Sequence, residues 1–347
     1  MKKGFVTVLV LLVAILCATP AFSASLSSTK VAKVKFNETT TFITQQELDD
    51  AVAEYSEAYG TSFDEATVLD ALISNVLFQQ ALERDGYTLT AEQKDQLLAS
   101  QKSSIESQLG ATLTDEQFES LLQSQQGIST EEYKEYLTNQ YLLQAYVSAM
   151  KADMLENIAE PTTSEIESFY KKNKSAFLSE ENVKLAHIYF EFGEDKEATL
   201  AKATEVADKI ASGEITFEQA VVDYSEDSSS KDAGGEIGWL QINDTDTMAY
   251  MGENFFDKVF ELGAGEVSGV IESLQGYHIV KVSVHNDTKI LGLDDKLYPT
   301  ETTTVREYIY SYLYSQNANT VFQNAYLSLI SDLKEEASIT YLKNFSN

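Results

Sequence analysis

Five helix-start patterns follow one another before residue 133, and they constrain the fold of this chain more than any other feature. In each, a Ser or Thr is followed three residues later by Glu or Gln, the capping box that satisfies the first backbone N–H groups of a helix. The pairs are Thr44 with Glu47, Ser62 with Glu65, Thr90 with Gln93, Thr114 with Gln117 and Ser129 with Glu132. Glycines, which often end helices, stand at positions 60, 86, 110 and 127. We therefore predict consecutive helices in this region.

The stretches between these signals have helical spacing of apolar residues. One predicted helix ends at Gly86, and a longer tyrosine-bearing one covers about residues 130–157. A strand is predicted before them at 31–36, and a break follows at residues 160–163.

The C-terminal part is predicted to be a long helix, about 302–336, followed by a short strand that begins at Ser338. We expect this strand to pair with the strand at 31–36, so that the C-terminal helix completes the N-terminal helical core. Tyr308, Tyr310, Tyr312 and Tyr314 alternate and cannot share one face of a helix, which indicates that some stay exposed as a binding surface. The alternative is that they are ordinary core and surface aromatics.

Residues 183–285 have a different pattern. Strand-like VKLAHIYFEF is followed by predicted helices near 195–212, 216–224 and 253–262, and then by the strand-like runs VSGVI and HIVKVSV. The order β-α-α-α-β-β predicts a small α+β domain with helices packed on one sheet.

Composition limits the partners and the compartment. The 347 residues suffice for two or three domains, and the net charge of −30 repels nucleic acid and anionic lipid headgroups. Residues 1–23 have the pattern of a secretory signal, with Lys2 and Lys3 before an apolar run too short to span a membrane comfortably. Cleavage before Ala24 would remove Cys17, the one cysteine, and leave no disulfide. Lipidation at Cys17 on the extracytoplasmic face is the alternative.

Several separated motifs between His187 and Val282 resemble parvulin-type peptidyl-prolyl isomerases. HIYF resembles the first-strand histidine motif, YSEDSSS the Ser-x-Asp-Ser turn, GGEIGW the glycine hinge and GYHIVKV the terminal strand. The resemblance covers about 100 residues and implies isomerisation of X-Pro bonds.

The resemblance also implies site residues. His187 and His278 correspond to the paired core histidines and Asp227 to the polar residue that faces the imide, so these three are the candidate catalytic residues. Ile237, Met251 and Phe255 correspond to the proline pocket, with Ser273 and Gln275 near its rim. Alternatively, the histidines only hold the geometry of the site, and Met251 and Phe255 are a core pair at i, i+4.

The segment between Leu240 and Met251 is about six residues longer than in the family pattern, which could alter access to the pocket. The loop FGEDKEA after the first strand is net acidic, so preference for phosphorylated peptides is not expected. Three histidines and no cysteine after cleavage leave little for a metal site, and no nucleotide fingerprint is present, so we expect neither metal nor cofactor.

The whole arrangement resembles exported foldases of the SurA/PrsA type. The predicted fold is α+β: a mainly helical SurA-like chaperone domain with an inserted parvulin domain. The expected limits are 1–23 for the signal peptide, 24–178 for the helical domain, 179–286 for the parvulin domain and 287–347 for the closing helix and strand.

The resemblance implies an exported, periplasmic isomerase and chaperone. Its partners would be unfolded or newly translocated polypeptides with X-Pro bonds, secreted or outer-membrane proteins among them, with transient membrane proximity and no nucleic acid. A holdase whose parvulin domain is inactive and only binds peptides is the alternative, and an assembly factor for one dedicated partner is a third.

Overall fold

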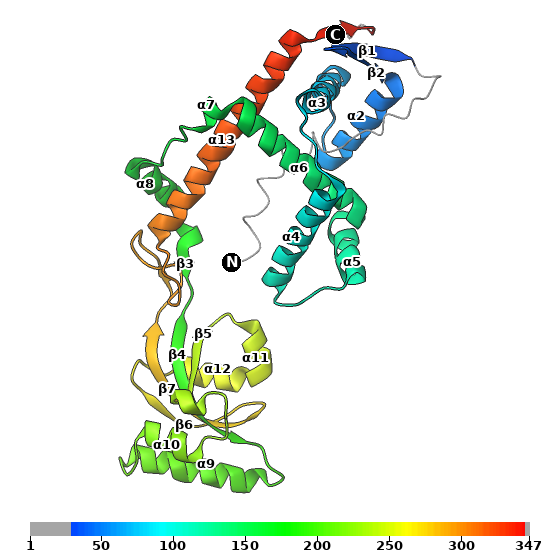
Figure 1. Ribbon diagram of the computed structural model, residues 1–347. Coiled ribbons are helices and arrows are strands. Elements are labelled where there is room, and N and C mark those ends of the chain that lie inside the picture. Colours follow the sequence, from blue (N-terminus) through cyan, green and yellow to red (C-terminus); the bar gives the residue numbers. More distant parts are fainter. Residues whose placement is uncertain (1–28, 344–347) are drawn as a thin grey trace. The chain divides into compact units, whose positions relative to one another are not determined.

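The computed structural model describes residues 29–343, which form two compact units (Figure 1). Unit 1 comprises the described residues up to Glu160 and from Tyr314 onward, and unit 2 is Pro161–Leu313. The predicted signal segment and Cys17 lie outside the described residues. The domain limits expected at residues 178 and 286 stay a prediction.

Unit 1 contains a three-stranded antiparallel sheet that joins the two ends of the chain. Val34 in the central strand β1 lies opposite Thr41 of β2 on one side and Ile339 of β9 on the other. The predicted pairing of the first and last strands is therefore confirmed. The hairpin strand β2 was not predicted, because its sequence TTTFIT has no alternation of apolar and polar residues. The strands are β1 Lys30–Phe36, β2 Thr39–Thr44 and β9 Ser338–Tyr341.

Helices form the rest of unit 1 and begin largely where the sequence predicts. Four of the five capping boxes are present, and all four glycines end helices in the left-handed conformation. The fifth was wrong: α3 is capped by Asp64, whose carboxylate accepts from the Thr67 backbone N–H, and not by Ser62. The helix predicted over 130–157 is broken at Lys151, where φ is −128°. The bounds are α2 Gln45–Tyr59, α3 Glu65–Asp85, α4 Ala91–Leu109, α5 Asp115–Gln126, α6 Thr130–Met150, α7 Ala152–Leu155 and α13 Val305–Glu336.

The main core of unit 1 surrounds α3, which is buried along most of its length. Side chains of β1, α2, the second half of α6 and the second half of α13 pack around it. Tyr326 of α13 belongs to this core and not to an exposed surface.

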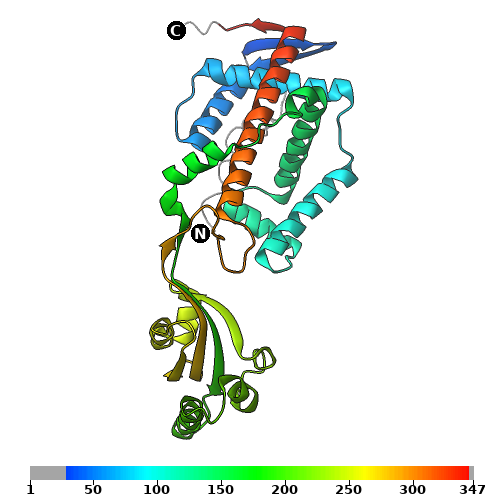
Figure 2. The ribbon, with the colours of Figure 1, turned by 90° about the vertical axis from the view of Figure 1, so that its left-hand side faces the viewer.

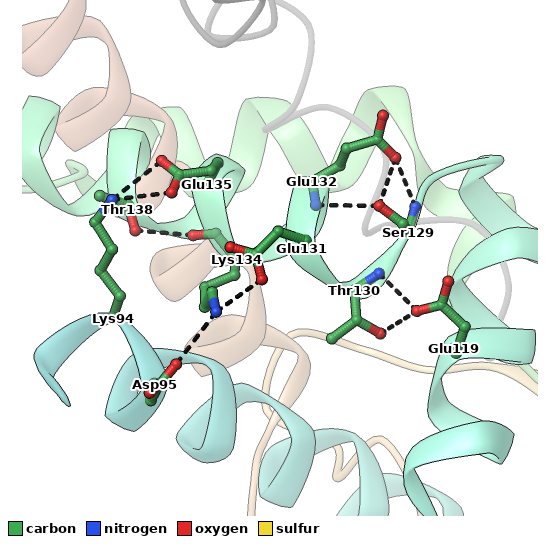
Figure 3. A network of polar contacts seen from close by, with 10 residues as sticks. All are labelled: Lys94, Asp95, Glu119, Ser129, Thr130, Glu131, Glu132, Lys134, Glu135 and Thr138. Atoms are coloured by element: carbon green, nitrogen blue, oxygen red, sulfur yellow. Dashed lines mark hydrogen bonds and ion pairs between the residues drawn. The ribbon is translucent and has the colours of Figure 1, made fainter. Parts of the chain in front are cut away.

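A second, smaller core lies between α4, α5 and the first half of α6. It contains Phe118, Leu122 and Tyr133, whereas α4 has no fully buried side chain. Polar contacts supplement this small core, and Figure 3 shows how they connect the three helices. Lys94 and Asp95 of α4 bind Glu135 and Lys134 of α6, and Glu119 of α5 accepts from the backbone N–H and the hydroxyl of Thr130.

Unit 2 contains a four-stranded antiparallel sheet in the order β5-β4-β7-β6, with helices on both faces (Figure 2). Alternate residues of the two central strands point to opposite faces. Ile188 and Phe190 of β4 pack with α9 and α10, whereas Val183 and Leu185 of the same strand pack with α12. The predicted α+β domain is present, but the predicted order of elements omitted β5 and α11. The bounds are β4 Asn182–Glu191, α9 Lys196–Ala211, α10 Phe217–Tyr224, β5 Glu236–Gln241, α11 Thr245–Met251, α12 Glu253–Phe260, β6 Val267–Glu272 and β7 Gly276–Asn286.

The remaining elements of unit 2 pack around the first part of α13. Ile166, Phe177, Leu291, Val305 and Ile309 form a small core there. Tyr308 and Tyr310 pack partly buried against it, and Tyr312 lies against Phe169 at 5.1 Å between ring centroids. These tyrosines serve the fold, and of the alternating four only Tyr314 is exposed. The elements are α8 Thr163–Lys172, the 3₁₀ helix Lys174–Phe177, β3 Leu178–Ser179 and β8 Lys289–Ile290.

Between residues 29 and 343, no helix combines the length and the apolar character that crossing a bilayer requires.

Candidate functional site

A cavity of about 410 Å³ opens on the α12 face of the sheet in unit 2. Strands β4, β5 and β7 form its floor, and α11 and α12 form one wall. Seven of the eight residues singled out from the sequence line it: His187, Asp227, Ile237, Met251, Phe255, Gln275 and His278. The eighth, Ser273, is buried behind His278.

A chain of hydrogen bonds connects four polar side chains on one side of the cavity. The Asp227 carboxylate lies 3.0 Å from His187 Nε2, and the Nδ1 atoms of His187 and His278 lie 3.1 Å apart. His278 Nε2 lies 2.9 Å from the hydroxyl of Ser273. His187 is thus joined to Asp227, 40 positions later in the sequence, and to His278, 91 positions later, at the edge of an apolar cavity.

The direction of the donors in this chain follows from the ionised Asp227. A carboxylate only accepts, so His187 donates from Nε2 and its Nδ1 is left to accept from His278 Nδ1–H. His278 Nε2 is then an acceptor for the Ser273 hydroxyl, which also lies 3.1 Å from the Gly276 carbonyl oxygen. This assignment requires neutral imidazoles, which the lowered pKa values of both histidines favour, and it fixes one tautomer for each ring.

Burial and hydrogen bonding separate the charges of the cluster. Burial favours a higher pKa for Asp227, but hydrogen bonds from Ser229, Ser230 and His187 outweigh it and hold that pKa well below its usual range. Burial lowers the pKa of His187, and burial together with the adjacent His187 lowers the pKa of His278 to about 3. At neutral pH the site has one negative charge, on Asp227, supported by two neutral histidines.

The loop after Asp227 can reach β4 only because of a glycine. Gly235 has φ +77°, and a Cβ at this position would lie 2.4 Å from the carbonyl oxygen of His187. The close approach allows the His187 backbone N–H to donate to the Gly235 carbonyl at 2.8 Å. The Gly-Gly-x-x-Gly hinge thus fixes the position of His187, the strand residue that hydrogen-bonds Asp227.

The opposite wall of the cavity is apolar. Met251 ends α11, and Phe255 of α12 places the edge of its ring against His278, with 5.0 Å between centroids. Leu185, Trp239, Leu240 and the half-exposed Ile237 complete this wall. Met251 and Phe255 are also core residues, because they belong to the buried cluster on this face of the sheet. The core and pocket interpretations of this pair are therefore compatible.

Several residues of the site were missed from the sequence, among them Tyr189, Ser230, Trp239 and Tyr250. Tyr189 could have been found, because it lies two residues after His187 on the same face of the strand. Ser230 donates to Asp227 from within the Ser-rich turn that was recognised as a unit. Trp239 and Tyr250 belong to β5 and α11, the two elements that the sequence analysis did not predict.

The third histidine of the chain is not part of this site. His285 Nδ1–H donates to the Leu262 carbonyl at 2.6 Å, and its Nε2 lies 2.8 Å from Glu181. The carbonyl contact raises its pKa, burial opposes this, and Glu181 raises it further.

Comparison with known families agrees with this geometry. Residues 187–284 match the model of the PPIC-type PPIASE domain, also described as rotamase, and residues 1–147 match the SurA-like N-terminal domain. The chain carries a parvulin-type isomerase domain and a SurA-like domain.

Curated relatives combine similar parts. The periplasmic chaperone PpiD of Haemophilus ducreyi is 28% identical over 230 residues, which cover 62% of this chain and 33% of that protein. The foldase protein PrsA of Clostridium botulinum (strain Okra) is 22% identical over 307 residues, 86% of this chain and 82% of that protein. The match thus spans a third of PpiD and most of PrsA.

A solved structure of SurA-like chaperones from Campylobacter jejuni is 15% identical and covers 84% of this chain and 94% of its own. The TM-score is 0.37.

Proposed function

We propose that this protein is an exported peptidyl-prolyl cis-trans isomerase and chaperone that acts on unfolded or newly translocated polypeptides. One observation supports the isomerase half above all: an ionised carboxylate, held by two neutral histidines, faces an apolar cavity of about 410 Å³. The family match at residues 187–284 and the relatives named foldase and chaperone support the same function.

The proposed chemistry needs no covalent intermediate. Rotation about a peptide C–N bond faces a barrier of about 18–20 kcal/mol because resonance gives the bond double-bond character. The planar form places negative charge on the carbonyl oxygen, so a carboxylate beside that oxygen disfavours it relative to the twisted form. Asp227 is the proposed catalytic residue, since it holds the negative charge of the site.

The other residues of the site position the bond. The apolar wall with Ile237, Met251 and Phe255 holds the pyrrolidine ring of proline, so rotation is confined to the preceding carbonyl. Hydrogen bonds connect Ser273 to His278, His278 to His187 and His187 to Asp227. This chain fixes the orientation of the Asp227 carboxylate. We assign the histidines a positioning role, because neither is a proton donor of suitable pKa at neutral pH.

Client binding is proposed for the SurA-like part, and export for the whole chain. Tyr141 and Met150 of α6 and Leu327 of α13 expose 47%, 41% and 62% of their surfaces, which favours contact with apolar segments. A signal peptide removed before Ala24 leads to the periplasm, and lipidation at Cys17 would instead keep the protein on a membrane surface. The expected clients are secreted or outer-membrane proteins with X-Pro bonds.

A protease-coupled assay on an Ala-x-Pro peptide, run beside a client-aggregation assay, tests both halves. We expect the wild type to accelerate isomerisation and to suppress aggregation, and Asp227→Ala to retain only the second property. If the pure wild type does not accelerate isomerisation, the isomerase half is wrong. If suppression of aggregation also survives combined Asp227→Ala and Met251→Ala in that case, the protein is a holdase.

A further inference from the structure

We propose that Tyr250, Leu274 and Tyr189 form an apolar subsite beside the proline cavity that selects a large apolar or aromatic side chain next to proline. This subsite deepens the proposed isomerase function and rests on it. We refer to these three residues, two tyrosines and a leucine, as the rim.

Tyr250 belongs to α11, in the segment between Leu240 and Met251, and lies at the edge of the cavity. It lines the cavity, yet 62% of its surface is exposed. The helix that carries it is fixed at its start, where the Asp244 carboxylate accepts from the backbone N–H and the hydroxyl of Thr247. A capped helix therefore holds this aromatic side chain in contact with water.

The end of the same helix is fixed by the loop that follows β6. The Leu274 backbone N–H donates to the Met251 carbonyl at 2.9 Å, and Gln275 Nε2 donates to the Tyr250 carbonyl at 3.1 Å. The loop that contains Ser273, the partner of His278, thus also supports Tyr250. The rim and the polar cluster are parts of one rigid assembly.

Leu274 extends the apolar surface next to Tyr250. Its side chain is 64% exposed and lies across Gly252, since a Cβ at Gly252 would be only 3.1 Å from Leu274 Cγ. Leu274 directly precedes Gln275, which lines the cavity, so its side chain continues the apolar surface beyond the cavity edge.

Tyr189 is the third residue of the rim and lies on β4, in the floor of the cavity. Its hydroxyl donates to the Gln275 carbonyl at 2.9 Å, and its ring lies 5.0 Å from that of His278. Tyr189 and Tyr250 both line the cavity. A side chain beside the bound proline therefore meets two tyrosines.

The charge around the rim excludes acidic side chains. Asp227 lines the same cavity as Tyr189 and Tyr250, and Glu191 follows Tyr189 by two residues on β4. Neither Lys nor Arg occurs among the residues that line the cavity in the described part of the chain. An apolar or aromatic side chain gains contact here at no electrostatic cost, whereas a carboxylate or phosphate is repelled.

A peptide series measures the selection. Xaa-Pro peptides with Phe, Leu, Ala, Lys or Glu at Xaa, and a second series with these residues after proline, are assayed for kcat/KM. We expect Phe or Leu to exceed Ala about tenfold at one of the two positions, with Glu the poorest. Tyr250→Ala or Leu274→Ser should reduce the Phe-to-Ala ratio to about two, and Tyr250→Phe should retain it.

Val222→Ser is the matched control, because Val222 is an equally exposed apolar residue (61%) on α10, which covers the other face of the sheet. A Phe-to-Ala ratio near one in the wild type, a preference for Lys, or a ratio unchanged by Tyr250→Ala overturns the subsite.

Titration of isotope-labelled protein with the Phe-Pro and Ala-Pro peptides, followed by NMR, gives the same ratio as dissociation constants. This measurement decides on the subsite even if no peptide is isomerised, an outcome that contradicts only the proposed function.

Discussion

Each unit of the protein contains a carboxylate with a depressed pKa, and the two differ in what surrounds them. In unit 1, Arg84 and Tyr146 bind Asp85 at 2.8 and 2.6 Å and lower its pKa to about 2. In the parvulin domain, hydroxyl groups and a neutral histidine hold the charge of Asp227.

The difference is in the neighbours that remain available to a ligand. The Asp85 cluster joins helices, since Arg84 also binds Glu336 near the end of α13, and a positive charge neutralises the carboxylate. Asp227 lines a cavity with its negative charge uncompensated by a cation. A depressed pKa therefore does not distinguish a structural carboxylate from a candidate site, whereas the cavity and the neutral partners do.

The largest expected effect is on catalysis and concerns the two carboxylates directly. Asp227→Asn keeps the shape of the side chain but removes its charge, and kcat/KM for an X-Pro peptide should fall about 100-fold. Asp85→Asn is the matched control and should leave kcat/KM within about twofold of wild type. Equal losses in both variants, or none in either, would contradict the distinction.

The pH response of the histidines comes next. Unfolded histidine has a pKa of about 6.5, whereas His278 in the folded protein takes up its proton only near pH 3. The unfolded chain binds more protons between these values, so the stability of the parvulin domain should fall as pH falls from about 6.5 to about 3. His285 has a raised pKa and acts oppositely: its contribution is present below pH 6.5 and lost as pH rises through its folded value.

NMR titration of the imidazole carbons checks this prediction. His278 should show no protonation above pH 5, and His285 should titrate above pH 6.5. A midpoint for His278 near 6.5 would contradict the neutral, tautomer-fixed pair.

Asp85→Asn should lower the stability of the protein, whereas Asp227→Asn lowers its catalytic activity. The variant weakens the contact to Tyr146 that joins α3 to α6, and also the contact to the neighbouring Arg84, so the free energy of unfolding of unit 1 should fall by about 1–3 kcal/mol. Urea unfolding followed by a probe in unit 1 measures this. An unchanged transition would show that the cluster is not structural.

The smallest effect is expected for Tyr146→Phe. The variant loses the hydroxyl bond to Asp85 and the long contact of 3.5 Å from Arg84, but Arg84 still binds the carboxylate, so the cost should be about 1 kcal/mol or less. Amide hydrogen exchange in α3 and α6 is sensitive enough to detect it. A loss larger than that of Asp85→Asn would place the stabilisation in the tyrosine and not in the carboxylate.

The sequence predicted the elements that are specified locally. Capping boxes at Thr44, Thr90, Thr114 and Ser129 were recognised because they need only side chains three residues apart. The strand pairing of β1 with β9 followed from two apolar runs at the ends of the chain.

Elements that depend on tertiary contacts were missed. Strand β5 contains glycine and only one residue fully buried, Leu240, so its pairing with β4 determines its conformation. Helix α11 has seven residues and is held by Leu274 and Gln275 from a distant loop. The motif resemblance identified seven residues of the cavity, but the order of donors from Ser273 to Asp227 required interatomic distances.

Two-dimensional exchange NMR on a Phe-Pro peptide tests the central claim most directly, because it observes cis-trans interconversion at equilibrium without a coupling protease. We predict exchange cross-peaks between the cis and trans signals with substoichiometric wild type and with Asp85→Asn, and their disappearance with Asp227→Asn. Cross-peaks of equal strength with wild type and Asp227→Asn, or none with the wild type, would contradict the account.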